Sequence, residues 1–176
     1  MSIPPTLKEQ ETKPEGVMNN SPKIAILTAS GVNEIEMTAI QRALGANRQR
    51  GHVVTPENGL IHSWGEGTWG HCYPSDAKLE VSLGADFDML VLPGGSRHVD
   101  KLLANPHTRR FVTSFFAMNK PVAAYGDAAR ILETNGFAGD NAVVLTYTDA
   151  ESLTAAAAQM MAHFETAQHN ALAEAA

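Results

Sequence analysis

Five short apolar runs, separated by turns and mostly helix-like stretches, constrain the fold of this chain more than any other feature of its sequence. They lie at residues 23–28, 52–56, 88–92, 120–125 and 142–146. Runs that are apolar throughout are typical of strands buried on both faces of a parallel sheet. Their alternation with helices predicts a three-layer α/β/α sandwich with a mainly parallel sheet.

The stretches between these runs carry the signals of helices and of one hairpin. Asn33 and Glu36 fit a capping box at the start of the first helix. The apolar face expected for that helix consists of Ile35, Ile40, Ala43 and Leu44. Further helices are predicted at residues 99–104, 107–118, 127–135 and 151–169. Glycines break residues 57–83 into short pieces, which predict a small hairpin at the sheet edge. This order of elements is flavodoxin-like.

The two ends of the chain differ in composition from its centre. Four prolines, several charged residues and few large apolar side chains predict a flexible linker or tail at residues 1–22. We expect one folded domain at residues 23–170 and a short C-terminal tail at residues 171–176.

The composition excludes several classes of function. A formal net charge of −6 provides no basic stripe for phosphates, which argues against a nucleic-acid partner. No apolar run approaches the roughly 20 residues that span a bilayer, so we expect no membrane partner. No secretory signal is visible, and a single cysteine excludes an internal disulfide. These features predict a cytoplasmic protein.

Residues 120–132 predict a strand, a sharp turn and a helix N-terminus, which is the geometry of a nucleophile elbow. The residue at the apex of such a turn faces free backbone N–H groups and the positive end of the helix dipole. Both lower the pKa of a thiol and stabilise anions. Here the apex residue is Gly126, which carries no nucleophile. The sequence therefore predicts the geometry of an active site without its reacting atom.

Two carboxyl groups near this turn have alternative interpretations. Asp127 is either the N-cap of the following helix, which we favour, or a carboxylate nucleophile. No metal-ligand or phosphoryl-transfer motif surrounds it to support the second interpretation. Glu36 either completes the capping box with Asn33 or faces the elbow as a protonated carboxyl group whose pKa is raised by burial. The two interpretations of Glu36 are compatible.

A second turn lies at the carboxyl end of another predicted strand. Residues 88–92 run into Pro93, Gly94 and Gly95, which place free backbone N–H groups where doubly wound sheets bind their ligands. Binding of a small anion between this loop and the helix end at Asp127 is one alternative function. The Asp127 carboxylate argues against it, because it already occupies the positive end of that helix.

Cys72 and three histidines are the remaining candidates for chemistry. Cys72 is interpreted as a free thiol on the hairpin, because its neighbour His71 points to the opposite face of an extended segment. A different histidine could still approach it. His62, His71 and His98 match no zinc spacing, so we expect scattered surface histidines, no metal and no cofactor.

Trp64 and Trp69 lie in the same glycine-rich stretch as the predicted hairpin. Exposed aromatic residues in such a stretch often mark a contact with another protein. Packing of the hairpin onto the sheet explains them equally well, and both interpretations stay open.

With these elements placed, the chain resembles the DJ-1/PfpI superfamily, a class I glutamine amidotransferase-like group, over roughly residues 23–146. The residues that carry the resemblance are Ile24-Ala-Ile-Leu, Gly31 with Glu34 and Glu36, Leu92-Pro-Gly-Gly95 and Lys120-Pro-Val-Ala-Ala. In that superfamily the elbow carries a reactive cysteine, commonly followed by a histidine and contacted by a glutamate.

The resemblance assigns these roles to residues of this chain. Gly126 and Asp127 stand at the cysteine and histidine positions, Glu36 at the glutamate position, and Gly94 and Gly95 in the pocket loop. It therefore implies a degenerate site that lacks its catalytic pair.

One branch of the superfamily is more similar still, the C-terminal domain of large-subunit haem catalases. The similarity lies in the elbow, in residues 139–150 and in the alanine-rich last helix. In those enzymes the domain follows the haem module through a proline-rich linker, which residues 1–22 resemble. The resemblance implies an auxiliary domain that is itself non-catalytic and is linked to subunit stability and to chaperone-like behaviour. We expect no haem module in this chain, which is far too short for one. In addition, none of Tyr73, Tyr125 and Tyr147 follows an arginine by four residues, as the proximal haem tyrosine of catalases does.

We therefore expect a non-catalytic domain with a structural, oligomer-stabilising or chaperone-like role, partnered by copies of itself or by a catalase core. The alternative is a hydrolase, amidase or glyoxalase of the superfamily that uses Cys72 or Asp127. Flavin binding has less support, because no Ser/Thr-rich phosphate loop follows the first strand.

Overall fold

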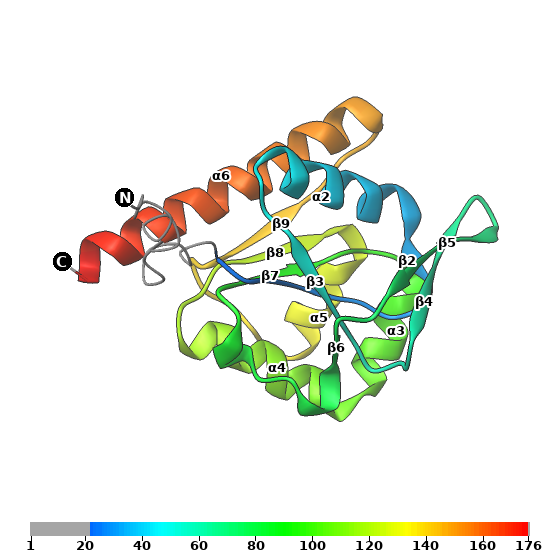
Figure 1. Ribbon diagram of the computed structural model, residues 1–176, viewed down its shortest axis with the longest axis horizontal. Helices are drawn as coiled ribbons and strands as arrows, with labels where there is room; N and C mark the ends of the chain where they lie inside the picture. Colours follow the sequence, from blue (N-terminus) through cyan, green and yellow to red (C-terminus); the bar gives the residue numbers. More distant parts are fainter. Residues whose placement is uncertain (1–21, 176) are drawn as a thin grey trace, which may run out of the picture.

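The computed structural model describes residues 22–175, in which six parallel strands form a central sheet between two layers of helices (Figure 1). Its order is β6-β3-β1-β7-β8-β9, and every neighbouring pair is parallel. The strands are β1 (Ile24–Leu27), β3 (Gly51–Thr55), β6 (Ala77–Lys78), β7 (Met89–Leu92), β8 (Val122–Tyr125) and β9 (Ala142–Leu145). The predicted flavodoxin-like sandwich is confirmed. Residues 1–21, which make up most of the predicted linker, lie outside the described residues.

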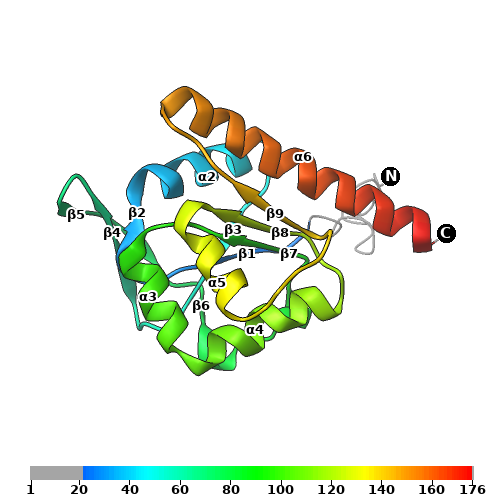
Figure 2. The same ribbon diagram turned by 180° about the vertical axis from the view of Figure 1, so that it is seen from behind.

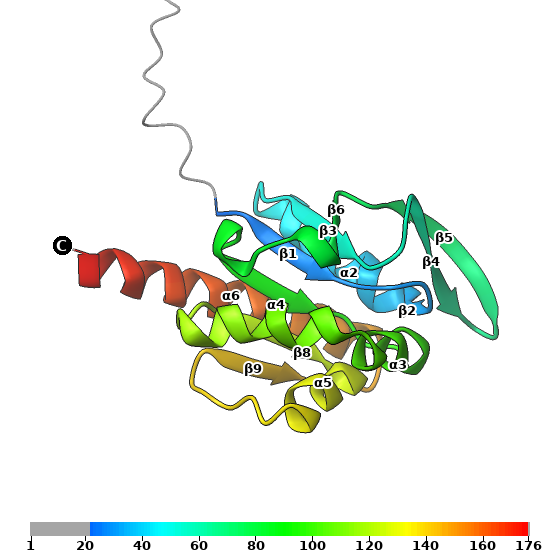
Figure 3. The same ribbon diagram turned by 90° about the horizontal axis from the view of Figure 1, so that it is seen from below.

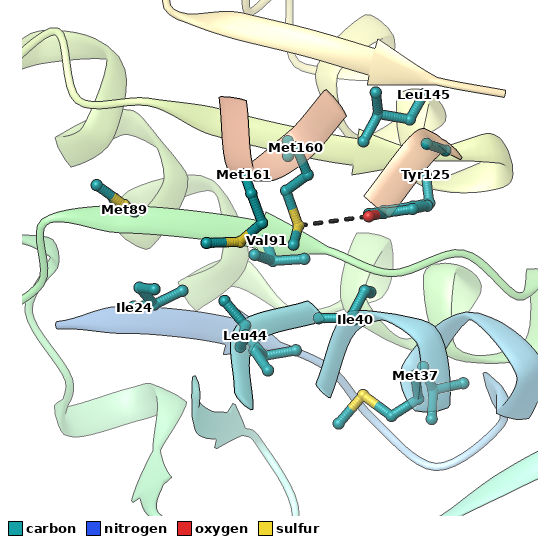
Figure 4. Packing of buried hydrophobic residues seen from close by; sticks show 14 of the residues in the cluster. Ile24, Met37, Ile40, Leu44, Met89, Val91, Tyr125, Leu145, Met160 and Met161 are labelled. Carbon is teal, nitrogen blue, oxygen red and sulfur yellow. Dashed lines mark hydrogen bonds between the residues drawn. The ribbon is translucent and has the colours of Figure 1, made fainter. Parts of the chain in front are cut away.

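The helices divide the core into two halves, one on each face of the sheet (Figure 2). One face is covered by α2 (Glu34–Ala46) and α6 (Ala150–Ala175), and the other by α3 (Ser96–Ala104), α4 (Pro106–Ala117) and α5 (Ala129–Thr134). Alternate strand residues enter alternate halves, as the period of two requires: Ile24 and Ile26 pack toward α2 and α6, and Ala25 and Leu27 toward the opposite layer. Figure 4 shows the α2–α6 half, where the Tyr125 hydroxyl donates to the Met160 sulfur at 3.3 Å.

The glycine-rich stretch forms the predicted hairpin from β4 (Leu60–Gly65) and β5 (Thr68–Pro74). The hairpin pairs with β2 (Val32–Asn33) in a separate three-stranded sheet (Figure 3), whereas β6 is the edge strand of the main sheet. Two 3-10 turns, η2 (Leu79–Val81) and η3 (Gly84–Asp86), return the chain to β7, and a third, η4 (Gly126–Ala128), follows β8.

Three details differ from the sequence-based expectations. Helix α6 continues to Ala175, so the predicted tail at residues 171–176 is helical almost throughout. Ile35 is 55% exposed, and Met37 takes the place expected for it on the buried face of α2. Asp127 lies inside the turn η4 and provides no side-chain cap, so its prediction as an N-cap is wrong.

No helix within residues 22–175 has both the length and the hydropathy needed to cross a bilayer.

Candidate functional site

The carboxyl ends of β7 and β8 bring together the segments predicted to form the site. The loop Pro93–Gly95 follows β7, the elbow at Gly126 follows β8, and the first turn of α2 lies against both. The carboxyl edge of a parallel sheet is where doubly wound folds bind ligands. The predicted elbow, pocket loop and glutamate therefore share one place in the structure.

Glu36 is the buried acid of this place, with 4% of its surface exposed. Asn33 caps α2 as predicted, since its side-chain oxygen accepts from the Glu36 backbone N–H at 3.0 Å. The reciprocal half of the capping box is absent, because the Asn33 N–H donates to the Gly94 carbonyl instead. The Glu36 carboxylate is thereby free to accept from the Gly94 N–H at 2.6 Å.

Tyr147 is the site residue that sequence reasoning missed. Its hydroxyl donates to the second carboxylate oxygen of Glu36, Oε2, at 2.5 Å. The sequence feature that indicates it is its position two residues after β9, because the carboxyl end of β9 lies at the same edge of the sheet as the elbow. Tyr147 therefore completes the set of hydrogen bonds to Glu36 from a segment 111 residues away.

Gly126 has φ of 48° and sits at the apex of the elbow, as predicted. A Cβ added there would lie 3.8 Å from Glu36 Oε2 and would meet nothing else within 4 Å beyond its immediate chain neighbours. A side chain at this position would thus point toward the Glu36 carboxylate, and the glycine supplies none. Asp127 is exposed on the same turn, and its charge acts on Glu36 from a distance.

The environment raises the pKa values of both groups of the Glu36–Tyr147 pair. Burial raises the pKa of Glu36, the bonds from Tyr147 and Gly94 partly oppose this shift, and the Asp127 charge adds to it. Burial also raises the pKa of Tyr147, and the hydrogen bond and negative charge of Glu36 raise it further. A phenol whose pKa is raised is a poor nucleophile at neutral pH, so Tyr147 fills the space beside Glu36 without providing an attacking group.

Cys72 lies away from the elbow, on the exposed hairpin. Its sulfur is 3.2 Å from His62 Nδ1, the residue paired with it across β4 and β5. As expected, His71 is not its partner and instead pairs with the Glu34 carboxylate. The structure therefore brings Cys72 and His62 together on one face of the hairpin, a pairing that their spacing in the sequence did not reveal.

The hairpin is fixed to the domain through its tryptophans. Trp64 and Trp69 pack edge to face with their ring centroids 4.8 Å apart, and the Arg97 guanidinium lies 3.9 Å from the Trp64 ring centroid. Arg97 belongs to α3, so this contact joins the hairpin to the main body. Packing of the hairpin onto the domain accounts for Trp64, whereas Trp69 remains 50% exposed.

The histidines are dispersed, but one of them is not on the surface. His98 is fully buried; its Nε2 donates to the Pro93 carbonyl at 2.6 Å, and its Nδ1 accepts from the Ala29 N–H at 3.3 Å. The prediction of surface histidines is therefore wrong for His98. Among residues 22–175 no three His, Cys, Asp or Glu side chains gather as a metal site would require.

Replacing Glu36 by glutamine tests the buried carboxyl group through the pH dependence of stability. Because its pKa is raised in the folded state, folded Glu36 keeps a proton that the unfolded chain loses as the pH rises above about 4.5. The contribution of Glu36 to the free energy of unfolding therefore falls as the pH rises toward the folded-state pKa. We expect the melting temperature of Glu36→Gln, relative to that of the parent, to increase as the pH rises above about 4.5, as thermal unfolding would measure. Glu133→Gln, on the exposed side of α5, is the matched control; an equal trend in both variants would contradict the assignment.

Comparison with known proteins identifies relatives of the whole folded region. The model of the DJ-1/PfpI family matches residues 22–171. Catalase HPII of Pseudomonas aeruginosa is 29% identical over 150 residues, which cover 81% of this chain and 20% of the catalase. The chain thus spans about a fifth of the length of that curated relative.

Solved structures show the same fold at low sequence identity. A two-domain protein of Anabaena variabilis, with DJ-1/ThiJ/PfpI-like and ferritin-like domains, aligns with a TM-score of 0.71 and 18% identity, covering 82% of this chain and 48% of that one. Oxidised DJ-1 of Toxoplasma gondii aligns with a TM-score of 0.66 and 16% identity, covering 85% and 95% of the two chains.

Proposed function

The chain belongs to the DJ-1/PfpI family, and from this premise we propose that it is a non-catalytic member with a structural, assembly-stabilising role. The observation that carries the proposal is the glycine at the apex of the elbow, which leaves the buried Glu36 with no nucleophile to serve. The adjacent position offers only Asp127, an exposed carboxylate.

The bonding of Glu36 supports the same conclusion. Both of its carboxylate oxygens are engaged by groups of the protein itself, the Gly94 N–H and the Tyr147 hydroxyl. These bonds tie together α2, the loop after β7 and the segment after β9, so the former site residues join three parts of the fold. Both oxygens of this acid are therefore occupied without any substrate.

The similarity to catalase HPII supports a role within a larger assembly. The part of the catalase that is similar covers only a fifth of its length. We propose that this chain acts in the same kind of setting, as a domain that stabilises a larger protein or an oligomer in the cytoplasm. A chaperone-like role is compatible with this proposal and would appear as suppression of client aggregation followed by light scattering.

Turnover assays test the proposal directly. We expect the purified chain to convert methylglyoxal, small amides and hydrogen peroxide no faster than buffer does, because no side chain at the elbow can attack them. Glu36→Gln should leave these background rates unchanged. Turnover by the parent that disappears in Glu36→Gln would show that the elbow is catalytic.

The alternative function, an enzyme that uses a displaced residue, rests on the Cys72–His62 pair. A thiol within 3.2 Å of an imidazole nitrogen is the arrangement of an activated nucleophile. Against it, the pair lies on an exposed hairpin and takes no part in the hydrogen bonds that hold the Glu36 carboxylate at the elbow. Activity that is lost in Cys72→Ser and blocked by iodoacetamide would favour this alternative.

A further inference from the structure

Two asparagines of this chain are directly followed by glycine, in the pairs Asn58–Gly59 and Asn135–Gly136. Such a pair is chemically labile, because the backbone nitrogen of the second residue can attack the side-chain amide carbon of the first. Glycine carries no Cβ that would hinder this attack. The reaction needs an available N–H and a backbone that can bring the two groups together. The two pairs differ in both respects.

Asn58 and Gly59 lie in the exposed connection between β3 and β4 (Figure 1). Within residues 22–175 neither the Asn58 side-chain amide nor the Gly59 N–H has a hydrogen-bond partner. Gly59 has φ of 81°, and a Cβ built there meets nothing within 4 Å beyond its immediate chain neighbours. The space around Gly59 is therefore open, and no hydrogen bond of either reacting group has to break before the two groups meet.

The second pair lies at the end of α5, and both of its reacting groups are occupied. The Asn135 side-chain Nδ2 donates to the Ile131 carbonyl at 2.8 Å, and the Gly136 N–H donates to the Glu133 carbonyl at 3.2 Å. Asn135 has ψ of 4°, which turns the Gly136 nitrogen away from the Asn135 side chain. Ring closure at this pair requires that both hydrogen bonds break and that the end of the helix rotates.

The residues on either side of the first asparagine are fixed to the rest of the domain. The Glu57 carboxylate accepts from the Ser30 N–H at 2.6 Å and from the Ser30 hydroxyl at 2.8 Å. The Gly59 carbonyl accepts from the Ser75 N–H at 2.8 Å. Ser30 also holds β4, because its hydroxyl accepts from the His62 N–H at 3.1 Å. A change in the length of the main chain between Glu57 and Gly59 therefore acts on both attachments.

We propose that Asn58–Gly59 is a site of spontaneous deamidation and isoaspartate formation, and that the fold protects Asn135–Gly136 from the same reaction. The Gly59 nitrogen bonds to Asn58 Cγ and loses its proton, the Cγ–Nδ2 bond breaks, and the amide nitrogen leaves with that proton as ammonia. A water molecule then opens the succinimide ring. Opening at Cγ gives aspartate, and opening at the main-chain carbonyl carbon gives isoaspartate. Nothing is oxidised or reduced.

Both products place a new carboxylate beside Glu57, but only isoaspartate changes the main chain. It inserts the side-chain methylene and so lengthens the connection between Glu57 and Gly59 by one carbon atom. The attachments at Ser30 and Ser75 then weaken, and their backbone N–H groups exchange hydrogen faster. The isoaspartate is also a substrate of the carboxyl methyltransferases that recognise this group. None of these steps uses the elbow, so the site is independent of the proposed function.

Ageing of the purified 176-residue chain in warm neutral buffer tests the proposal. Mass spectrometry of its peptides should show the side-chain NH₂ replaced by OH at Asn58. At Asn135 the rate should be lower on the order of tenfold, because two hydrogen bonds must break first. In guanidinium chloride, where the fold is lost, both asparagines should react at similar rates. An unreactive Asn58, equal rates in the folded protein, or a slower Asn135 in both solvents would overturn the proposal.

Two variants separate the products. Asn58→Gln is the matched control, because glutamine must close a larger ring, and it should remove the sites that an isoaspartate methyltransferase labels in the aged chain. Asn58→Asp, measured fresh, supplies the charge without the extra main-chain atom. Faster hydrogen exchange at Ser30 and Ser75 in the aged parent, but not in fresh Asn58→Asp, would support the lengthened connection. Unchanged exchange in the aged parent, or equal acceleration in fresh Asn58→Asp, would overturn it.

Discussion

Replacing Gly95 by alanine is expected to lower the free energy of unfolding by about 3 kcal/mol or more. Gly95 has φ of 116°, in a region that side-chain-bearing residues rarely adopt. A Cβ built there would lie 2.8 Å from the Asn33 nitrogen and 2.9 Å from the Gly31 carbonyl oxygen. Both are backbone atoms, so neither can rotate away as the end of a flexible side chain would. The free-energy cost of the positive φ and the cost of the close contacts of the added Cβ therefore add.

Urea unfolding of two glycine variants would separate these effects. Gly59 also has a positive φ, 81°, but a Cβ there meets nothing within 4 Å beyond its immediate chain neighbours. Gly59→Ala should therefore show the conformational strain alone, about 1–2 kcal/mol. Equal losses in the two variants would show that the close approach of the Gly95 loop to β2 contributes nothing. A larger loss in Gly95→Ala would establish that the pocket loop is fixed by contact with the backbone of residues 31–33.

The fold could be predicted because its signals are local. Each buried strand is a short apolar run, and Asn33 starts α2 at the position that its side chain indicates. The loop at Gly94 and the apex at Gly126 could be placed for the same reason, since each lies in the turn that directly follows a strand. Because β1, β7 and β8 are neighbouring parallel strands, the segments that follow their carboxyl ends lie at the same edge of the sheet. This arrangement places Glu36, in the first turn of α2, beside the elbow.

The parts that could not be predicted depend on contacts between distant segments. No sequence motif marks Tyr147 as a site residue. Only the parallel pairing of β8 with β9 shows that the segment after β9 lies beside Glu36. Asp127 carries the sequence signal of a cap, but a 3-10 turn begins one residue earlier and takes Asp127 into the turn. His98 falls where α3 passes under the ends of β1 and β7, and only the assembled sheet shows that it is buried.

Acidification is expected to destabilise the protein through His98, by roughly 3 kcal/mol between pH 6.5 and pH 4. Burial lowers the pKa of His98 to about 4, and the nearby Lys101 charge adds to this while the bond to the Pro93 carbonyl opposes it. The unfolded chain binds a proton near the ordinary value of 6.5, whereas the folded chain stays neutral until about 4. The stabilising contribution of neutral His98 is therefore complete above pH 6.5 and is lost as the pH falls through this window. Protonation of Nδ1 would also abolish its bond from the Ala29 N–H.

His98→Gln isolates this contribution from that of Glu36. The contribution of Glu36 to stability falls as the pH rises, whereas that of His98 increases. Glutamine can donate to the Pro93 carbonyl but does not titrate, so the variant should be less stable than the parent at pH 7 and should lose most of that deficit by pH 4. Urea unfolding at several pH values measures the difference, and His169→Gln, on the exposed end of α6, is the matched control. A deficit of the same size at pH 7 and pH 4 would mean that His98 titrates alike in the folded and unfolded chains. A shrinking deficit would show that the neutral imidazole holds the ends of β1 and β7 together behind the Gly94–Gly95 loop.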